Sequence, residues 1–172
     1  MTAIMQQKYE RPLSRDDYRQ ASRHSVRLVT WNAKEPNLAG AIRTAEAFML
    51  DHVYMLRKPK CMSPTVGTEN WQPTTYTTNL LEAIQEAKRD GYTIVALEQT
   101  NASVRLTEAI LPYRMCLVAG DEGEGVPPKA LALCDMAVVI PQYGMVGSLN
   151  VVTATSIALY EWTRQHGGQH HD

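Results

Sequence analysis

The fold is decided by the stretch Gly120-Asp121-Glu122-Gly123-Glu124-Gly125-Val126-Pro127-Pro128, which is followed by Ile140-Pro141-Gln142 and Gly147-Ser148-Leu149-Asn150. Glycines let backbone N–H and C=O groups approach a ligand without an intervening Cβ. The apolar runs at 114–119 and 136–140 are short and end at these loops, which is typical of buried strands. We therefore expect both loops at one sheet edge, around one nucleotide-sized pocket.

The rest of the chain alternates between strand and helix patterns. Strands are also predicted at 26–32, 52–56 and 92–97, and helices at 36–50, 79–90, 127–133 and 149–164. This order predicts an α/β fold with a mostly parallel sheet and helices on both faces. The segment 58–78 has no period and is predicted to be a long loop that faces the substrate.

Length and composition favour one globular domain, since 172 residues with 44% hydrophobic and 20% charged side chains can form a sizeable core. No apolar run approaches the roughly 20 residues of a membrane helix or the apolar centre of a signal peptide, so we expect a cytoplasmic protein. The three cysteines, Cys61, Cys116 and Cys134, lack Cys-x-x-Cys spacing, which favours packing thiols over a metal or disulfide role.

The net charge of −1 conceals a basic start. Arg15, Arg19 and Arg23 recur at every fourth residue and would form one stripe on a helix, which Ser14 and Asp17 would begin as a capping box. The stripe is either a solvated helix face or an arm that contacts RNA phosphates.

The charge pattern also suggests how the chain is divided. We expect a basic arm at 1–25, a globular domain at 26–165 and a flexible tail at 166–172, which contains His170 and His171.

Three motifs resemble the SpoU/TrmH family of the SPOUT superfamily of methyltransferases. The segment 37–48 is similar to the family's Asn-x-x-x-x-x-Arg-x-Ala helix, and the loops at 120–125 and 140–150 are similar to its second and third motifs. The resemblance implies an S-adenosylmethionine-dependent RNA ribose 2′-O-methyltransferase that acts on tRNA or rRNA. It also implies a homodimer and a C-terminal trefoil knot, although threaded chains are otherwise very rare.

In this family the motif arginine, here Arg43, activates the ribose hydroxyl. Arginine is nearly always protonated, which favours an electrostatic role over a role as base. The sequence predicts Arg43 among packing residues, and the alternative is a surface arginine paired with Glu46. Asn37 would position Arg43 or the ribose, or would cap its helix.

The resemblance also assigns the residues of the two later motifs. Glu122 either ties its loop to a helix start through backbone N–H groups or contacts the substrate. Ser148 and Asn150 belong to the family's catalytic centre, although both could be helix caps. The cofactor would contact Gly120, Ile140, Leu149 and Leu97, and the chemistry needs no metal.

Two positions depart from the family pattern: Gln142 replaces the usual Met, and Asp121 replaces the usual Asn or Pro. Both could alter the fit of the substrate. Trp71, in the long loop, would either stack on bases or pack against the protein. A catalytically silent RNA-binding or assembly protein of the same fold is the alternative function. A Rossmann enzyme is disfavoured because no Gly-x-Gly-x-x-Gly joins the first strand to its helix.

Overall fold

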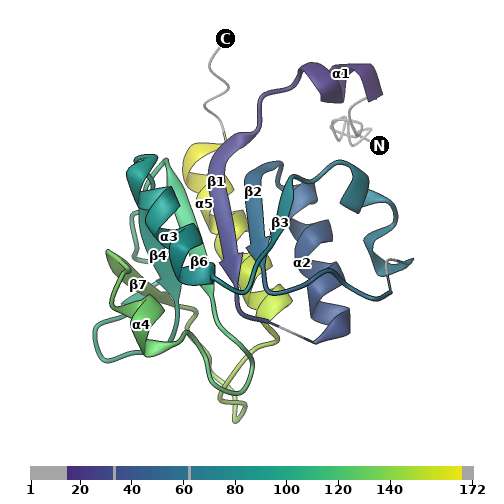
Figure 1. Ribbon diagram of the computed structural model, residues 1–172. Coiled ribbons are helices and arrows are strands. Elements are labelled where there is room, and N and C mark those ends of the chain that lie inside the picture. The colour runs from purple at the N-terminus through teal and green to yellow at the C-terminus, as the bar shows by residue number, and fades with distance from the viewer. Residues whose placement is uncertain (1–14, 33, 62, 168–172) are drawn as a thin grey trace, which may run out of the picture.

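The computed structural model describes residues 15–32, 34–61 and 63–167. Ser14 and the tail histidines lie outside this range. The described part contains a seven-stranded, wholly parallel sheet in the order β3-β2-β1-β6-β4-β7-β5 (Figure 1). The strands are β1 (His24–Thr30), β2 (Leu50–Met55), β3 (Thr74–Tyr76), β4 (Thr93–Leu97), β5 (Val104–Arg105), β6 (Met115–Ala119) and β7 (Met136–Val139).

Helices cover both faces of the sheet, as the sequence predicts (Figure 1). Helices α2 (Glu35–Ala47) and α5 (Val151–His166) pack on one face, and α3 (Leu80–Arg89) and α4 (Pro128–Leu131) pack on the other. The short α1 (Arg15–Gln20) precedes the sheet. The expected trefoil knot concerns the threading of the chain, and it stays a prediction, as does the division into arm, domain and tail.

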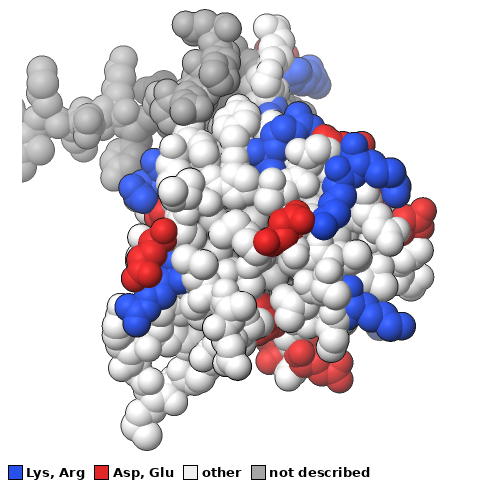
Figure 2. All heavy atoms as spheres, turned by 90° about the vertical axis from the view of Figure 1, so that its left-hand side faces the viewer, with Lys and Arg blue, Asp and Glu red and all other residues white. Residues whose placement is uncertain are grey.

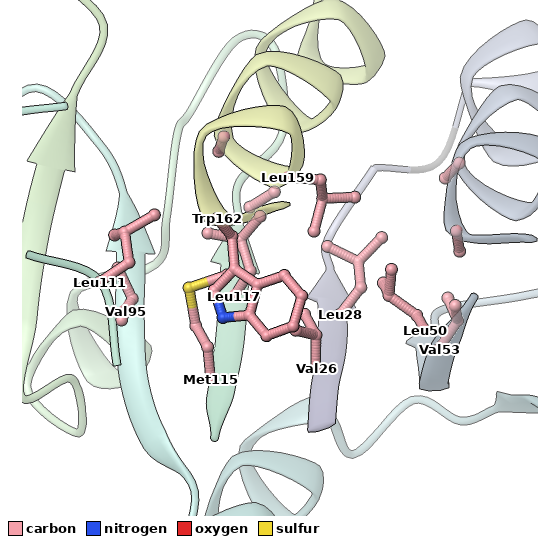
Figure 3. Close-up of a cluster of buried hydrophobic side chains, with 14 of the residues drawn as sticks. Val26, Leu28, Leu50, Val53, Val95, Leu111, Met115, Leu117, Leu159 and Trp162 are labelled. Atoms are coloured by element: carbon pink, nitrogen blue, oxygen red, sulfur yellow. The ribbon is translucent and has the colours of Figure 1, made fainter. Parts of the chain in front are cut away.

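The core has two layers because successive residues of a strand point to opposite faces. In the central strand β6, Met115 and Leu117 pack with α2 and α5, whereas Cys116 and Val118 pack with α3. Figure 3 shows the first layer, in which Trp162 of α5 lies over the central strands. Every residue of β6 is buried, which explains why its sequence is a continuous apolar run.

Helices α2 and α5 approach closely because small residues line their contact. A Cβ built on Gly40 would lie 3.1 Å from Val152 Cγ2, and the Thr44 hydroxyl lies 3.3 Å from that of Ser156. This contact brings α2 and the N-terminal half of α5 side by side, so both helices begin near the carboxyl ends of the strands.

The predicted loop at 58–78 contains more structure than expected. It holds two 3₁₀ turns, Ser63–Thr65 and Thr68–Asn70, and the edge strand β3. The segment before β6 also contains the unpredicted strand β5. Both strands have only two or three residues and pair with a single neighbour, so neither has the apolar run by which sequence reasoning finds strands.

An ion cluster around Arg27 joins the sheet to α3. The guanidinium Nε donates to Asp51 at 2.8 Å and NH1 donates to Asp90 at 2.7 Å, while the group stacks 4.4 Å from the Tyr92 ring centroid. Burial by itself raises the pKa of Asp51, but hydrogen bonds from Arg27 and Tyr92 hold that pKa below its usual value.

Replacing Arg27 with Met should lower the free energy of unfolding by about 1–2 kcal/mol at neutral pH. This loss is smaller than that expected for a fully buried ion pair, because solvent screens Asp51, which is 38% exposed. The depressed pKa of Asp51 contributes stability above its unfolded value of about 3.9, and this contribution disappears as the pH falls through the folded value. In urea unfolding, the free energy of unfolding of Arg27→Met should therefore be lower than that of wild type at pH 7, and this gap should narrow below about pH 4. Arg105→Met is the control, since Arg105 and its partner Glu108 are both exposed. Equal stability of Arg27→Met and wild type at pH 7 would contradict the role of the cluster.

Candidate active site and ligand cavity

A cavity of about 480 Å³ lies where β4, β6 and β7 end. Because these strands are parallel, their carboxyl ends deliver the following loops to one edge of the sheet. The four predicted cofactor residues, Leu97, Gly120, Ile140 and Leu149, all line this cavity. The structure thus brings together residues that are up to 52 positions apart in the sequence, while their role in binding stays a prediction.

The loop after β6 is closed on itself. Asp121 and Gly125 exchange two backbone hydrogen bonds of 3.0 and 2.9 Å, and the Asp121 carboxylate accepts the Gly123 N–H at 2.8 Å. A Cβ at Gly120 would lie 2.0 Å from the backbone carbon of Gly125. Glycine is therefore required at position 120 for the loop to close, and Asp121, a departure from the family pattern, stabilises the turn.

Glu98 holds this loop against β4, and the sequence analysis did not identify it. Its Oε2 accepts the Val126 N–H at 2.7 Å, and its Oε1 accepts the Gln99 N–H at 2.8 Å. A Cβ at Gly125, where φ is +67°, would lie 2.4 Å from Glu98 Oε2. In the sequence, Glu98 is a glutamate directly after a buried strand, and nothing local links it to the glycine-rich loop after β6.

A polar cluster lies beside the cavity, where the starts of α2 and α5 meet the loop. Asn37 Nδ2 donates to Glu122 Oε1 at 2.5 Å, and Asn150 Nδ2 lies 2.9 Å from Asn37 Oδ1 and 3.0 Å from Glu122 Oε1. Lys34 Nζ also donates to Glu122. The hydrogen bonds from Lys34 and Asn37 lower the pKa of Glu122, so the carboxylate is ionised at neutral pH.

This cluster decides between several readings of the sequence. Asn37 lies in the first turn of α2 rather than capping it, since the N-cap is Lys34. Asn150 is both a cap and a cluster member, because its Oδ1 accepts the Val152 N–H at 2.9 Å. Glu122 accepts hydrogen bonds from the side chains of Lys34, Asn37 and Asn150. Among the described residues it accepts none from the backbone of a helix start, which the structural reading had expected.

Ser148 lines the cavity, and no hydrogen bond joins its side chain to another described residue. Its neighbour Gln142, the second departure from the family pattern, also lines the cavity and is exposed. Both side chains are therefore available to a bound molecule.

Arg43 lies outside the cavity on an exposed part of α2, so the expectation of an arginine among packing residues is wrong. The alternative pairing with Glu46 is absent too, since that carboxylate lies 3.2 Å from Arg23. No hydrogen bond or ion pair joins Arg43 to the described part of its own chain. Its guanidinium is thus free to meet an anion or a second protein chain.

The prediction that Arg15, Arg19 and Arg23 form one stripe on a helix is wrong, because α1 ends at Gln20 and Arg23 lies outside it. Arg23 instead donates to the carbonyl oxygens of Leu50 at 2.9 Å and Trp71 at 2.6 Å, which makes it an internal support. Arg19 is 65% exposed and lies 3.4 Å from Asp16. RNA contact by Arg15 and Arg19 stays a prediction.

Trp71 packs against the edge of Tyr18, with ring centroids 5.2 Å apart, so the structure favours packing at this residue. Within the described ranges, no set of three or more His, Cys, Asp or Glu side chains is arranged to hold a metal ion. No helix there is both long and apolar enough to cross a membrane.

Residues 25–160 match the model of the SpoU rRNA methylase family. The tRNA (guanosine(18)-2′-O)-methyltransferase of Aquifex aeolicus is 35% identical over 136 residues, which cover 76% of this chain and 64% of that protein. A mouse tRNA (guanosine(18)-2′-O)-methyltransferase is 34% identical over 77% of this chain but only 9% of its own length.

The crystal structure of the A. aeolicus TrmH/SpoU tRNA modifying enzyme superposes with a TM-score of 0.78 at 31% identity, covering 86% of this chain and 78% of that one. The chain spans less than two thirds of the length of the curated relatives named above. The family model nevertheless covers most of the chain and includes the cavity and the polar cluster. This protein therefore belongs to the SpoU rRNA methylase family, the SpoU/TrmH group that its three motifs resemble.

Proposed function

We propose that this protein transfers a methyl group from S-adenosylmethionine to a ribose 2′-hydroxyl of tRNA. The observation that carries the proposal is the contact between a nucleotide-sized cavity and the Asn37–Glu122–Asn150 cluster. The names of the relatives favour tRNA over rRNA as the substrate. A cytoplasmic site of action stays a prediction from the sequence.

The cavity fits this cofactor in shape and charge. Leu97, Ile140 and Leu149 offer apolar walls for a flat base, and the Gly120 backbone is open to a close approach. Its lining includes carboxylates, among them Glu98, and no lysine or arginine, which suits a sulfonium cation. When bound there, the cofactor would supply a methyl group that is already activated.

The residues beside the cavity can orient the nucleophile. Asn37 and Asn150 each place an amide next to the ionised Glu122, so this network can accept from and donate to ribose hydroxyls. The protonated guanidinium of Arg43 would stabilise the negative charge that develops on the attacking oxygen. Such a role needs Arg43 near a cavity, yet it lies outside the cavity of its own chain.

A homodimer resolves this conflict, because Arg43 of the partner subunit could then complete each site. The residues from 136 to 160 contain no Asp, Glu, Lys or Arg, and they include the exposed Tyr143 and Tyr160 of the β7–α5 loop and α5. Figure 2 shows that this loop, at the lowest point of the view, is free of charge. Exposed apolar side chains on an uncharged segment are typical of a protein interface.

A catalytically silent RNA-binding protein is the second candidate. A protein without catalysis would have no need for an ionised glutamate held between two asparagines at a cavity rim. The intact cluster therefore favours the enzyme.

Calorimetry with S-adenosylmethionine in metal-free buffer should show binding. Glu98→Ala should weaken the affinity about tenfold, because losing a hydrogen bond to a charged acceptor frees the loop. Glu108→Ala is the control, since Glu108 is an exposed carboxylate that does not line the cavity. An absence of binding by folded wild-type protein would refute the cofactor assignment, and equal affinities of the two variants would refute the role of Glu98.

Arg43→Ala should lower methyl transfer to a tRNA transcript by about 10²-fold or more and leave cofactor affinity unchanged, because the arginine acts on the hydroxyl. Radiolabelled methyl transfer and calorimetry measure the two effects. Near-normal turnover in this variant would rule out Arg43 as a catalytic residue.

Mixing Arg43→Ala with Gly120→Ala, in which the new Cβ obstructs the loop, should restore part of the activity through mixed dimers. Circular dichroism and sedimentation establish that each variant folds and associates. Complete inactivity of the confirmed mixed dimer would overturn the shared site.

A further inference from the structure

Charge is divided unevenly along the described chain. Residues 15–70 contain nine Lys and Arg against six Asp and Glu, a net charge of +3, whereas residues 71–167 contain six against ten, a net charge of −4. The first part supplies α2 and the loop that follows β2, and the second part supplies the cavity. A polyanion near the site would therefore be attracted toward the α2 side and repelled from the cavity rim.

Lys58 and Lys60 are available cations on the basic side. Both are exposed, and neither forms an ion pair or a side-chain hydrogen bond with another described residue, although Lys58 is close enough to Glu69 to help lower its pKa. Several acidic groups of this part are already engaged, since Glu46 pairs with Arg23 and Asp51 pairs with Arg27. The two lysines thus account for much of the uncompensated charge.

The loop that carries both lysines is held in place beside the polar cluster. Glu35, in the first turn of α2, accepts the Lys60 N–H at 2.8 Å and also pairs with Arg57. Lys34, which directly precedes Glu35, contacts Glu122 of the cluster. The loop also follows the carboxyl end of β2, which is the edge of the sheet where the cavity lies.

The loop presents its two lysines to solvent from a fixed backbone. Pro59 is buried between them, whereas the residues on either side of it are exposed. A buried anchor between two exposed cations keeps the ammonium groups outside the fold without burying either charge. A basic pair on a fixed backbone is suited to bind consecutive phosphates of one strand.

We propose that Lys58 and Lys60 bind backbone phosphates of the RNA next to the nucleotide whose ribose enters the polar cluster. This site rests on the proposed function, and its ligand is the phosphate backbone rather than a base. On the other side of the cluster, the rim carboxylates Asp121 and Glu124 disfavour phosphates. The RNA strand therefore passes from the cluster toward the loop after β2.

The test is a salt titration of RNA binding by the 172-residue chain, without cofactor. An unmodified, fluorescently labelled tRNA transcript is titrated with wild type and with Lys58→Gln/Lys60→Gln between about 50 and 200 mM salt. The slope of log K against log salt should fall by about 2 in magnitude, because each lost phosphate contact changes it by about 1. Cofactor affinity, and methyl transfer at saturating tRNA, should stay at the wild-type value.

Lys129→Gln is the matched control, since Lys129 is an exposed lysine of α4 on the opposite face and forms no ion pair with the described residues. Thermal unfolding confirms that each variant is folded. A double variant with the slope and affinity of Lys129→Gln would overturn the phosphate site. The titration measures binding and needs no catalysis. A failure to methylate tRNA would therefore refute the proposed function without affecting this test of the phosphate site.

Discussion

The close approach of Gly120 to Gly125 is the constraint on which the site depends. No side chain fits at position 120, because a Cβ would lie 2.0 Å from the opposite backbone. The closed loop lets Glu98 accept the Val126 N–H from one side, while Glu122 of the same loop reaches Asn37 and Asn150 on the other. One backbone contact therefore shapes the cavity wall and also delivers the carboxylate of the polar cluster.

Electrostatics then separates the surfaces around this loop. The cavity is lined by carboxylates without a basic side chain, the α2 side is basic, and the segment from 136 to 160 is uncharged. In the proposed enzyme these three regions would meet a cationic cofactor, an anionic RNA and a second subunit. Because each region differs in charge, each disfavours the ligands of the other two.

Sequence reasoning succeeded where a local pattern is tied to a backbone requirement. Asn79 caps α3 and Gly91 follows it at a φ of +81°, as their residue types predict. It failed at Arg23, where a spacing of four residues predicted a helical stripe but α1 ends at Gln20. The side chain is instead satisfied by carbonyl oxygens from Leu50 and Trp71, which no local pattern reveals.

The sequence by itself determined the parallel α/β architecture and the position of the ligand loops, and its family resemblance pointed to Asn37, Glu122 and Asn150. The architecture follows from periodicity, and the loops follow from their glycines. Only the tertiary structure decided that Glu98 secures the loop, that Arg43 is exposed outside its own cavity, and that the loop with Lys58 and Lys60 is tied to the start of α2. Contacts between residues distant in the chain depend on how strands and helices pack, and this information is absent from any short segment.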